Sequence, residues 1–143
     1  MIYEATEVTD ELVEAFVRLI PQLSSSSAPT SRADLAAIAG SEACALFMAR
    51  DTTGTIVGSL TLAVFPIPTG VRAWIEDVVV DDSARGAGVG EALVAAAVDR
   101  ARSLGAKTVD LTSRPSREAA NRLYMRVGFE ERTTNVYRFN AMG

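Results

Sequence analysis

Residues 78–90 read Val78-Val79-Val80-Asp81-Asp82-Ser83-Ala84-Arg85-Gly86-Ala87-Gly88-Val89-Gly90. Consecutive valines are typical of a buried strand, and the glycines lead into a helical apolar pattern over residues 89–104. The first N–H groups of a helix lack intrahelical partners, and glycine lets an anion approach them closely. The stretch therefore predicts a strand, a phosphate-binding turn and a helix, with Arg85 adding positive charge at the edge of the turn.

The glycine spacing does not fit two common nucleotide-binding motifs. A P-loop needs Gly-Lys-Ser/Thr at the start of its helix, whereas this turn continues Gly90-Glu91-Ala92. A dinucleotide fingerprint needs G-x-G-x-x-G, but the third position is Glu91 counted from Gly86 and Leu93 counted from Gly88. A nucleotide-dependent oxidoreductase is therefore the least favoured interpretation.

Apolar periodicity outward from this stretch predicts the remaining elements in the order β-α-α-β-β-β-α-β-α-β-β. The expected strands cover residues 2–7, 44–50, 55–65, 71–80, 107–112, 129–133 and 135–140, and the expected helices cover 9–20, 31–39, 89–104 and 117–127. The unit 71–112 should form a parallel crossover, and the other strands antiparallel hairpins. We expect an α/β (α+β) fold with a mixed, mostly antiparallel twisted sheet in a single domain, 1–143.

Composition narrows the chemistry. The chain has a net charge of −4, which argues against nucleic-acid binding, and no histidine, which excludes Ser-His-Asp catalysis and the usual zinc sites. Cys44 is the single cysteine and lies in an apolar run, where it predicts a buried small side chain. The chain shows neither a signal pattern nor a membrane-spanning stretch, so we expect a cytoplasmic protein without membrane partners or a bound metal.

Two motifs together resemble the GNAT superfamily of N-acetyltransferases. The family's central signature, Arg/Gln-x-x-Gly-x-Gly/Ala after a strand, is similar to the turn Arg85 to Gly90. Its later signature, Ala-x-x-Leu-Tyr-x-x-x-Gly-Phe, is similar to Ala120-Asn121-Arg122-Leu123-Tyr124-Met125-Arg126-Val127-Gly128-Phe129. The resemblance implies the GNAT fold and acetyl-CoA as the acetyl donor.

The resemblance also implies roles for individual residues. Main-chain groups of Val78 and Val80 would pair with the pantetheine arm, and Tyr124 would face the thioester sulfur. Many members have an asparagine seven residues before that tyrosine, where this chain has Arg117; Asn121, one helical turn on, is a possible substitute. The implied cofactor contacts are Val78, Val79, Val80, Arg85, Gly86, Ala87, Gly88, Val89, Gly90, Arg117 and Asn121.

The reaction needs a base, because a free amine is mostly protonated at neutral pH. Glu76 is the favoured candidate, since side-chain alternation would put it on the strand face of Val78 and Val80, and Asp77 is the second choice. Either carboxylate could instead pair with Arg72. An N–H near Val79 or Val80 could stabilise the oxyanion, and Tyr124 could protonate the leaving thiolate.

The acceptor has no diagnostic motif. A small-molecule amine or a peptide amine fits equally well, and a homodimer formed through C-terminal strands is possible. The chief alternative to an enzyme is a non-catalytic acyl-CoA-binding or regulatory module on the same fold, because the cradle residues alone would suit either. The presence of both Glu76 and Tyr124 favours direct acetyl transfer in a ternary complex.

Overall fold

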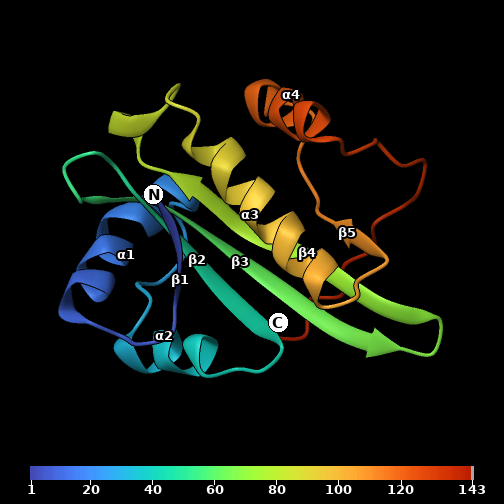
Figure 1. Ribbon diagram of the computed structural model, residues 1–143, viewed down its shortest axis with the longest axis horizontal. Coiled ribbons are helices and arrows are strands. Elements are labelled where there is room, and N and C mark those ends of the chain that lie inside the picture. Colours follow the sequence, from blue (N-terminus) through green and yellow to red (C-terminus); the bar gives the residue numbers. More distant parts are fainter. Residues whose placement is uncertain (143) are drawn as a thin grey trace.

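A central sheet with helices on both faces makes up the computed structural model, which describes residues 1–142 (Figure 1). The elements are β1 (Ile2–Ala5), α1 (Asp10–Leu23), α2 (Arg32–Ala39), β2 (Cys44–Arg50), β3 (Ile56–Ile67), β4 (Gly70–Val80), a 3-10 turn (Asp82–Ala84), α3 (Val89–Ser103), β5 (Thr108–Asp110) and α4 (Glu118–Val127). The strands lie in the order β1-β2-β3-β4-β5, all antiparallel except the parallel pair β4 and β5. The predicted crossover around α3 is therefore confirmed. None of the helices within residues 1–142 is both long and apolar enough to cross a bilayer.

The helix ends follow from local chemistry. The Thr9 side chain accepts a hydrogen bond from the Leu12 N–H at 3.1 Å and so caps α1. Ser31 and Asp34 form a reciprocal capping box at the start of α2, as their spacing predicts. The sequence predicts that this helix ends at residue 20, before Pro21, but the helix continues to Leu23. A proline removes its own N–H bond and crowds the carbonyl of the preceding turn, but Pro21 lies close enough to the C-terminal end that only two helical residues follow it.

Side-chain alternation gives the sheet two apolar faces. On one face, residues such as Phe47 and Leu60 pack with Leu93 and Val94 of α3. On the other, residues such as Met48 pack with the buried side of α1 and α2. The sheet is thus covered by α3 and α4 on one side and by α1 and α2 on the other.

A β-bulge interrupts β4 next to the glycine-rich turn. Thr61 of β3 lies opposite Glu76 and Ser59 opposite Val79, so one β3 residue faces both Asp77 and Val78. Asp77 has a φ of 51° and is the one non-glycine residue with positive φ among the described residues. The extra residue lets Ile75 and Val78 pack against the same cluster beneath α3.

The bulge corrects one expectation. Regular alternation would put Glu76 on the face of Val78 and Val80. Because Ile75 shares the face of Val78, its neighbour Glu76 lies on the opposite face. The prediction assumed that side chains two positions apart lie on the same face. The extra residue of the bulge, between Glu76 and Val78, breaks that alternation.

β4 and β5 separate beyond their first few residues. They pair only from Arg72 opposite Thr108 to Trp74 opposite Asp110. The end of β4, with its valines, therefore has β3 on one side and no strand on the other.

The two strands expected over 129–133 and 135–140 are not formed, so the sheet has five strands rather than seven. The aromatic and apolar side chains there favour a strand locally. In the structure Tyr137 and Phe139 are about nine-tenths exposed, so no layer covers an apolar face that would hold them in the sheet. The three-residue β5 also offers few backbone groups for pairing.

Candidate active site

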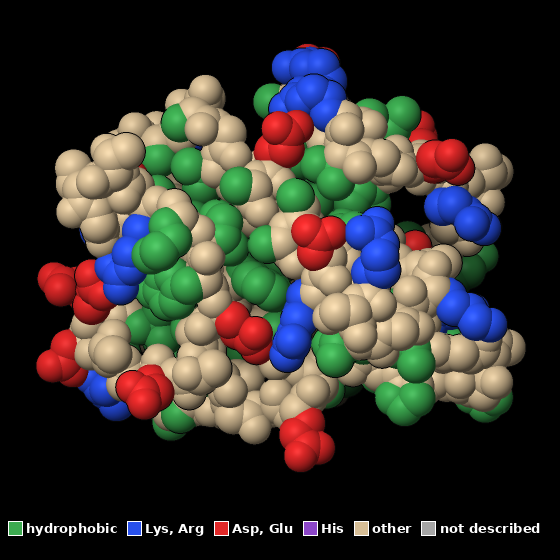
Figure 2. Space-filling view, viewed as in Figure 1, with side chains coloured by type: hydrophobic (Ala, Val, Ile, Leu, Met, Phe, Trp, Pro, Cys, Tyr) green, Lys and Arg blue, Asp and Glu red, His purple; other side chains and the backbone are tan. Residues whose placement is uncertain are grey.

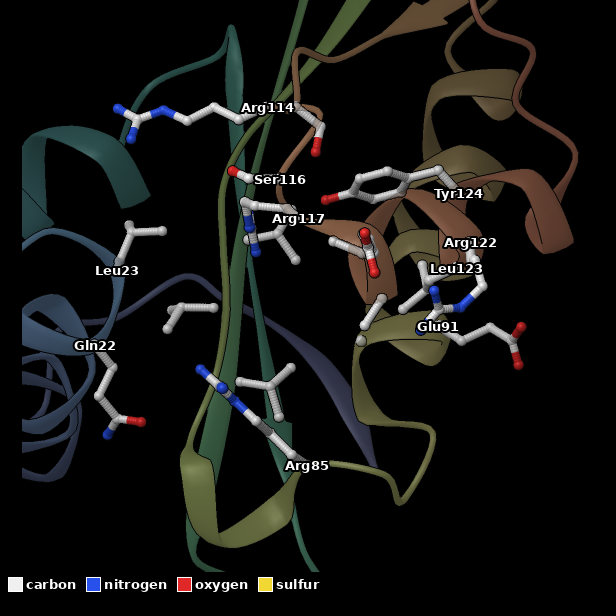
Figure 3. Close-up of a pocket in the computed structure, with 18 of the residues that line it drawn as sticks. Gln22, Leu23, Arg85, Glu91, Arg114, Ser116, Arg117, Arg122, Leu123 and Tyr124 are labelled. Atoms are coloured by element: carbon white, nitrogen blue, oxygen red, sulfur yellow. The ribbon is translucent and has the colours of Figure 1, made fainter.

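The end of β4, the glycine-rich turn and α4 surround a cavity of about 1560 Å³. Its far wall is the C-terminal end of α1 and the loop after it, as Figure 3 shows with Gln22 and Leu23 opposite Glu91 and Leu123. Several predicted cofactor residues line it: Val78, Val79, Val80, Arg85, Gly86, Gly88, Val89, Gly90 and Arg117. Ala87 and Asn121 do not belong to this lining, and the Asn121 Nδ2 donates to the Arg114 carbonyl at 3.1 Å.

The glycine-rich turn has the backbone of an anion cradle. Gly86 and Gly88 both have a φ of 81°, a left-handed conformation that other residues seldom adopt. Gly88 is the N-cap of α3 and provides no side chain to bond the first N–H groups of the helix. Arg85 pairs with Asp82 at 2.9 Å while remaining 64% exposed, so its guanidinium stays available at the rim. The turn therefore combines free N–H groups, a helix dipole and a cation.

The free edge of β4 has peptide groups for an extended ligand. The Asp81 N–H donates to the Val57 carbonyl of β3 at 2.7 Å. Because peptide groups alternate along a strand, those of Val79 also face β3, and those of Val80 and Val78 face the open edge. Of the two N–H groups suggested for the oxyanion, only that of Val80 faces the open edge.

Tyr124 lies near the C-terminal end of α4 and lines the cavity. It is 7% exposed, and its ring contacts Phe129 edge to face at a centroid distance of 6.0 Å. The Phe129 N–H donates to the Tyr124 carbonyl at 2.9 Å, with Gly128 at a φ of 118° completing the turn. The Gly-Phe ending of the motif thus fixes the tyrosine at the end of α4.

The hydroxyl of Tyr124 points into the cavity, toward Ser116 and Arg117 (Figure 3). Burial raises the pKa of this hydroxyl above its ordinary value of 10.0, and the nearby Arg117 charge offsets only part of that effect. Tyr124 therefore remains protonated throughout the neutral range and can act as an acid.

A smaller cavity of about 160 Å³ adjoins the first at Val78, Arg117 and Tyr124. Glu76 and Asp77 line it, and neither belongs to the lining of the larger cavity. Both carboxylates are exposed, and within residues 1–142 neither forms an ion pair. Arg72, considered above as their partner, donates instead to the Thr69 hydroxyl at 3.2 Å. The bulge therefore presents two unpaired carboxylates beside Tyr124.

Sequence reasoning missed a clamp that joins α1 to the glycine-rich turn. Arg18 Nη1 donates to Asp81 Oδ2 at 3.0 Å, and the Asp82 N–H donates to Gln22 Oε1 at 2.8 Å. Asp81 also accepts from the Ser83 N–H at 3.0 Å, which lowers the pKa of its carboxyl more than Arg18 does. The Asp-x-Ser spacing could have indicated the local turn, but no sequence signal links residues 18 and 81.

Basic side chains are frequent around the larger cavity of this acidic chain. Figure 2 shows Lys and Arg side chains gathered over α4. Of the arginines lining the cavity, Arg85 and Arg126 have carboxylate partners. Within residues 1–142 the others form no ion pair: Arg114, Arg117, Arg122 and Arg138. This positive charge suits anionic groups on the molecules that the cavity binds.

The open strand edge and the glycine cradle, which meet beside a buried tyrosine, fit an acyltransferase that takes its acyl group from coenzyme A. The sequence profile of the acetyltransferase (GNAT) family matches residues 6–129. The chain belongs to this family, whose members use acetyl-CoA as the acetyl donor.

Three similar proteins support the assignment. Glucosamine 6-phosphate N-acetyltransferase of Trypanosoma brucei brucei is 46% identical over 80 residues, which are 54% of this chain and 52% of that protein. Mycothiol acetyltransferase of Propionibacterium freudenreichii is 34% identical over 91 residues, which are 64% of this chain and 29% of that protein. A putative acetyltransferase structure from Agrobacterium tumefaciens has a TM-score of 0.86 at 23% identity, covering 98% of this chain and 99% of its own. The matches thus cover about half or less of the length of the two named relatives. The similarity to the Agrobacterium structure extends over the whole chain and shows a shared fold.

Proposed function

We propose that this protein is an N-acetyltransferase that transfers the acetyl group of acetyl-CoA to a primary amine. The observation that carries the proposal is one continuous cavity joining the glycine cradle, the open edge of Val78–Val80 and the Tyr124 hydroxyl. The free N–H groups and Arg85 would hold the diphosphate, and peptide groups of Val78 and Val80 would bind the pantetheine arm as an added strand. Acetyl-CoA would supply an acetyl group activated as a thioester.

The acceptor amine would enter from the smaller cavity. Glu76, or Asp77 next to it, would accept a proton from the ammonium group through a water molecule. The amine nitrogen would bond to the acetyl carbon and lose its second proton to solvent as the carbon–sulfur bond breaks, and Tyr124 would give its proton to the departing sulfur. Bulk water then reprotonates the tyrosine, so the net products are an N-acetylated amine, coenzyme A and one proton.

The proposed ternary complex needs no acetyl-enzyme. Cys44, in β2, is partly buried and lines neither cavity. We therefore expect no acetyl group on Cys44 during turnover, which mass spectrometry of the quenched protein would check.

The decisive experiment measures coenzyme A release from acetyl-CoA across a panel of amines. The panel includes glucosamine 6-phosphate, because a relative is named for that acceptor, together with free amino acids, a polyamine and a peptide N-terminus. Acceptor-dependent release above the no-amine blank supports the enzyme. Tight acetyl-CoA binding without release for any amine would favour a non-catalytic acyl-CoA-binding module.

A further inference from the structure

The smaller cavity carries both signs of charge. Glu76 and Asp77 form one side of its lining, and Arg117 belongs to the same lining. The remaining lining combines apolar side chains, such as those of Leu23 and Leu111, with the hydroxyl-bearing Thr112 and Tyr124. A cavity of about 160 Å³ that presents two carboxylates and one guanidinium favours a compact ligand with opposite charges of its own.

The Arg117 side chain is not used by the fold. Its N–H donates to the Arg114 carbonyl at 3.0 Å, and its carbonyl accepts from the Asn121 N–H at 2.9 Å, so the backbone is engaged. The guanidinium forms neither an ion pair nor a hydrogen bond within residues 1–142. Although Arg117 is the N-cap residue of α4, its side chain does not cap the helix.

Arg117 lies away from the glycine cradle, where the phosphates of the cofactor are proposed to bind. In Figure 3, Arg85 and the cradle lie at one end of the larger cavity, and Arg117 lies at the other beside Tyr124. If acetyl-CoA binds as proposed, its phosphates occupy the cradle and its uncharged thioester end reaches Tyr124. An anion at Arg117 would then have to come from the acceptor.

We propose that the acceptor is a small amine that also carries an anionic group, a phosphate or a carboxylate, which Arg117 binds while the amine lies beside Glu76 and Asp77. This inference rests on the proposed function and names the substrate class of the same site. A guanidinium can bind either anion through paired hydrogen bonds, so phosphate and carboxylate share the chemistry.

The test compares pairs of amines that differ only in the anionic group. Glucosamine 6-phosphate against glucosamine tests phosphate, and glycine against glycinamide tests carboxylate. We expect the wild-type kcat/KM to favour the anionic member of at least one pair by roughly tenfold or more. The pair that shows the preference identifies the anion.

Variants assign that preference to Arg117. Arg117→Ala should remove it by raising the KM of the anionic amine while leaving the KM of acetyl-CoA unchanged, and Arg117→Lys should restore part of it. Arg122→Ala is the matched control, because this arginine also lacks an ion pair but lines only the larger cavity. It should leave the ratio within each pair unchanged.

Three results would overturn the inference. The wild type could show no preference within either pair, or Arg117→Ala could leave the preference intact. Alternatively, Arg117→Ala could raise the KM of acetyl-CoA equally with both members, which would place the guanidinium on the cofactor.

If no amine is acetylated, titration calorimetry in the presence of coenzyme A separates the two proposals. Binding of glucosamine 6-phosphate or glycine that Arg117→Ala abolishes would support anion recognition while the proposed transfer fails. Absence of binding by both would refute the acceptor class itself.

Discussion

Replacing Gly88 by alanine tests whether the cradle depends on a left-handed backbone. Gly88 has a φ of 81° and a ψ of 10°, and a Cβ built there meets no atom within 4 Å. The substitution therefore introduces strain without a clash, amounting to about 1–2 kcal/mol. Because the turn is exposed, the free protein can relieve that strain by changing conformation.

The bound state cannot relieve the strain in this way, since the diphosphate needs the N–H groups in their cradle arrangement. Binding would then have to restore the strained backbone, so the dissociation constant of coenzyme A should rise by about 5- to 30-fold. The melting temperature should change little. Titration calorimetry and thermal unfolding measure the two quantities.

Gly54→Ala is the matched control. Gly54 has a φ of 86°, and its Cβ would also meet nothing within 4 Å. It lies in the hairpin between β2 and β3, where its N–H donates to the Asp51 carbonyl at 3.1 Å. This closed turn cannot relax without losing hydrogen bonds, so the variant should melt a few degrees lower and bind coenzyme A normally. Equal coenzyme A affinity in Gly88→Ala and the wild type would refute the cradle argument.

Four further substitutions probe the site and the turn beside it. Tyr124→Phe should lower kcat far more than it raises the KM of acetyl-CoA. It should also remove any decline of kcat above pH 10, because the raised pKa of Tyr124 places loss of its phenolic proton there. A kcat within about threefold of wild type would disprove the proton-donor role. Glu76→Gln should reduce kcat more than Asp77→Asn if Glu76 is the base, and the reverse order would assign the role to Asp77. Asp81→Asn should lower the melting temperature at neutral pH, because the folded protein holds the pKa of this carboxyl below its ordinary 3.8. The stabilisation from Asp81 is complete above that ordinary value and is lost as the pH falls through the lower folded value, so the two melting temperatures should converge in acid; a constant difference would contradict this assignment.

Local signals predicted much of this fold. The crossover around α3 was predicted from the order of short periodic segments and is confirmed. The Thr9 cap and the Ser31–Asp34 capping box depend on residues three positions apart, so they too follow from local sequence. The glycine turn has the left-handed backbone that its composition indicates. The family also follows from motifs readable in the sequence.

Features that depend on a partner element were not predictable in the same way. Glu76-Asp77-Val78 shows no glycine or proline to indicate a bulge, yet the bulge decides which face Glu76 occupies. The clamp between Arg18 and Asp81 joins residues 63 positions apart. Residues 135–140 have the composition of a strand, but pairing requires a neighbouring edge that local composition cannot specify.

The bulge at Asp77 also has an evolutionary consequence. A chain lacking this one residue would keep Ile75, Val78 and Val80 on their present face and Glu76 on the other, so both apolar layers would survive. β3 and β4 would then form an uninterrupted hairpin, without the kink that brings two carboxylates to the wall of the smaller cavity. A regular hairpin and the bulged one thus differ by a single inserted codon, and the insertion leaves the valines on their present faces of the sheet.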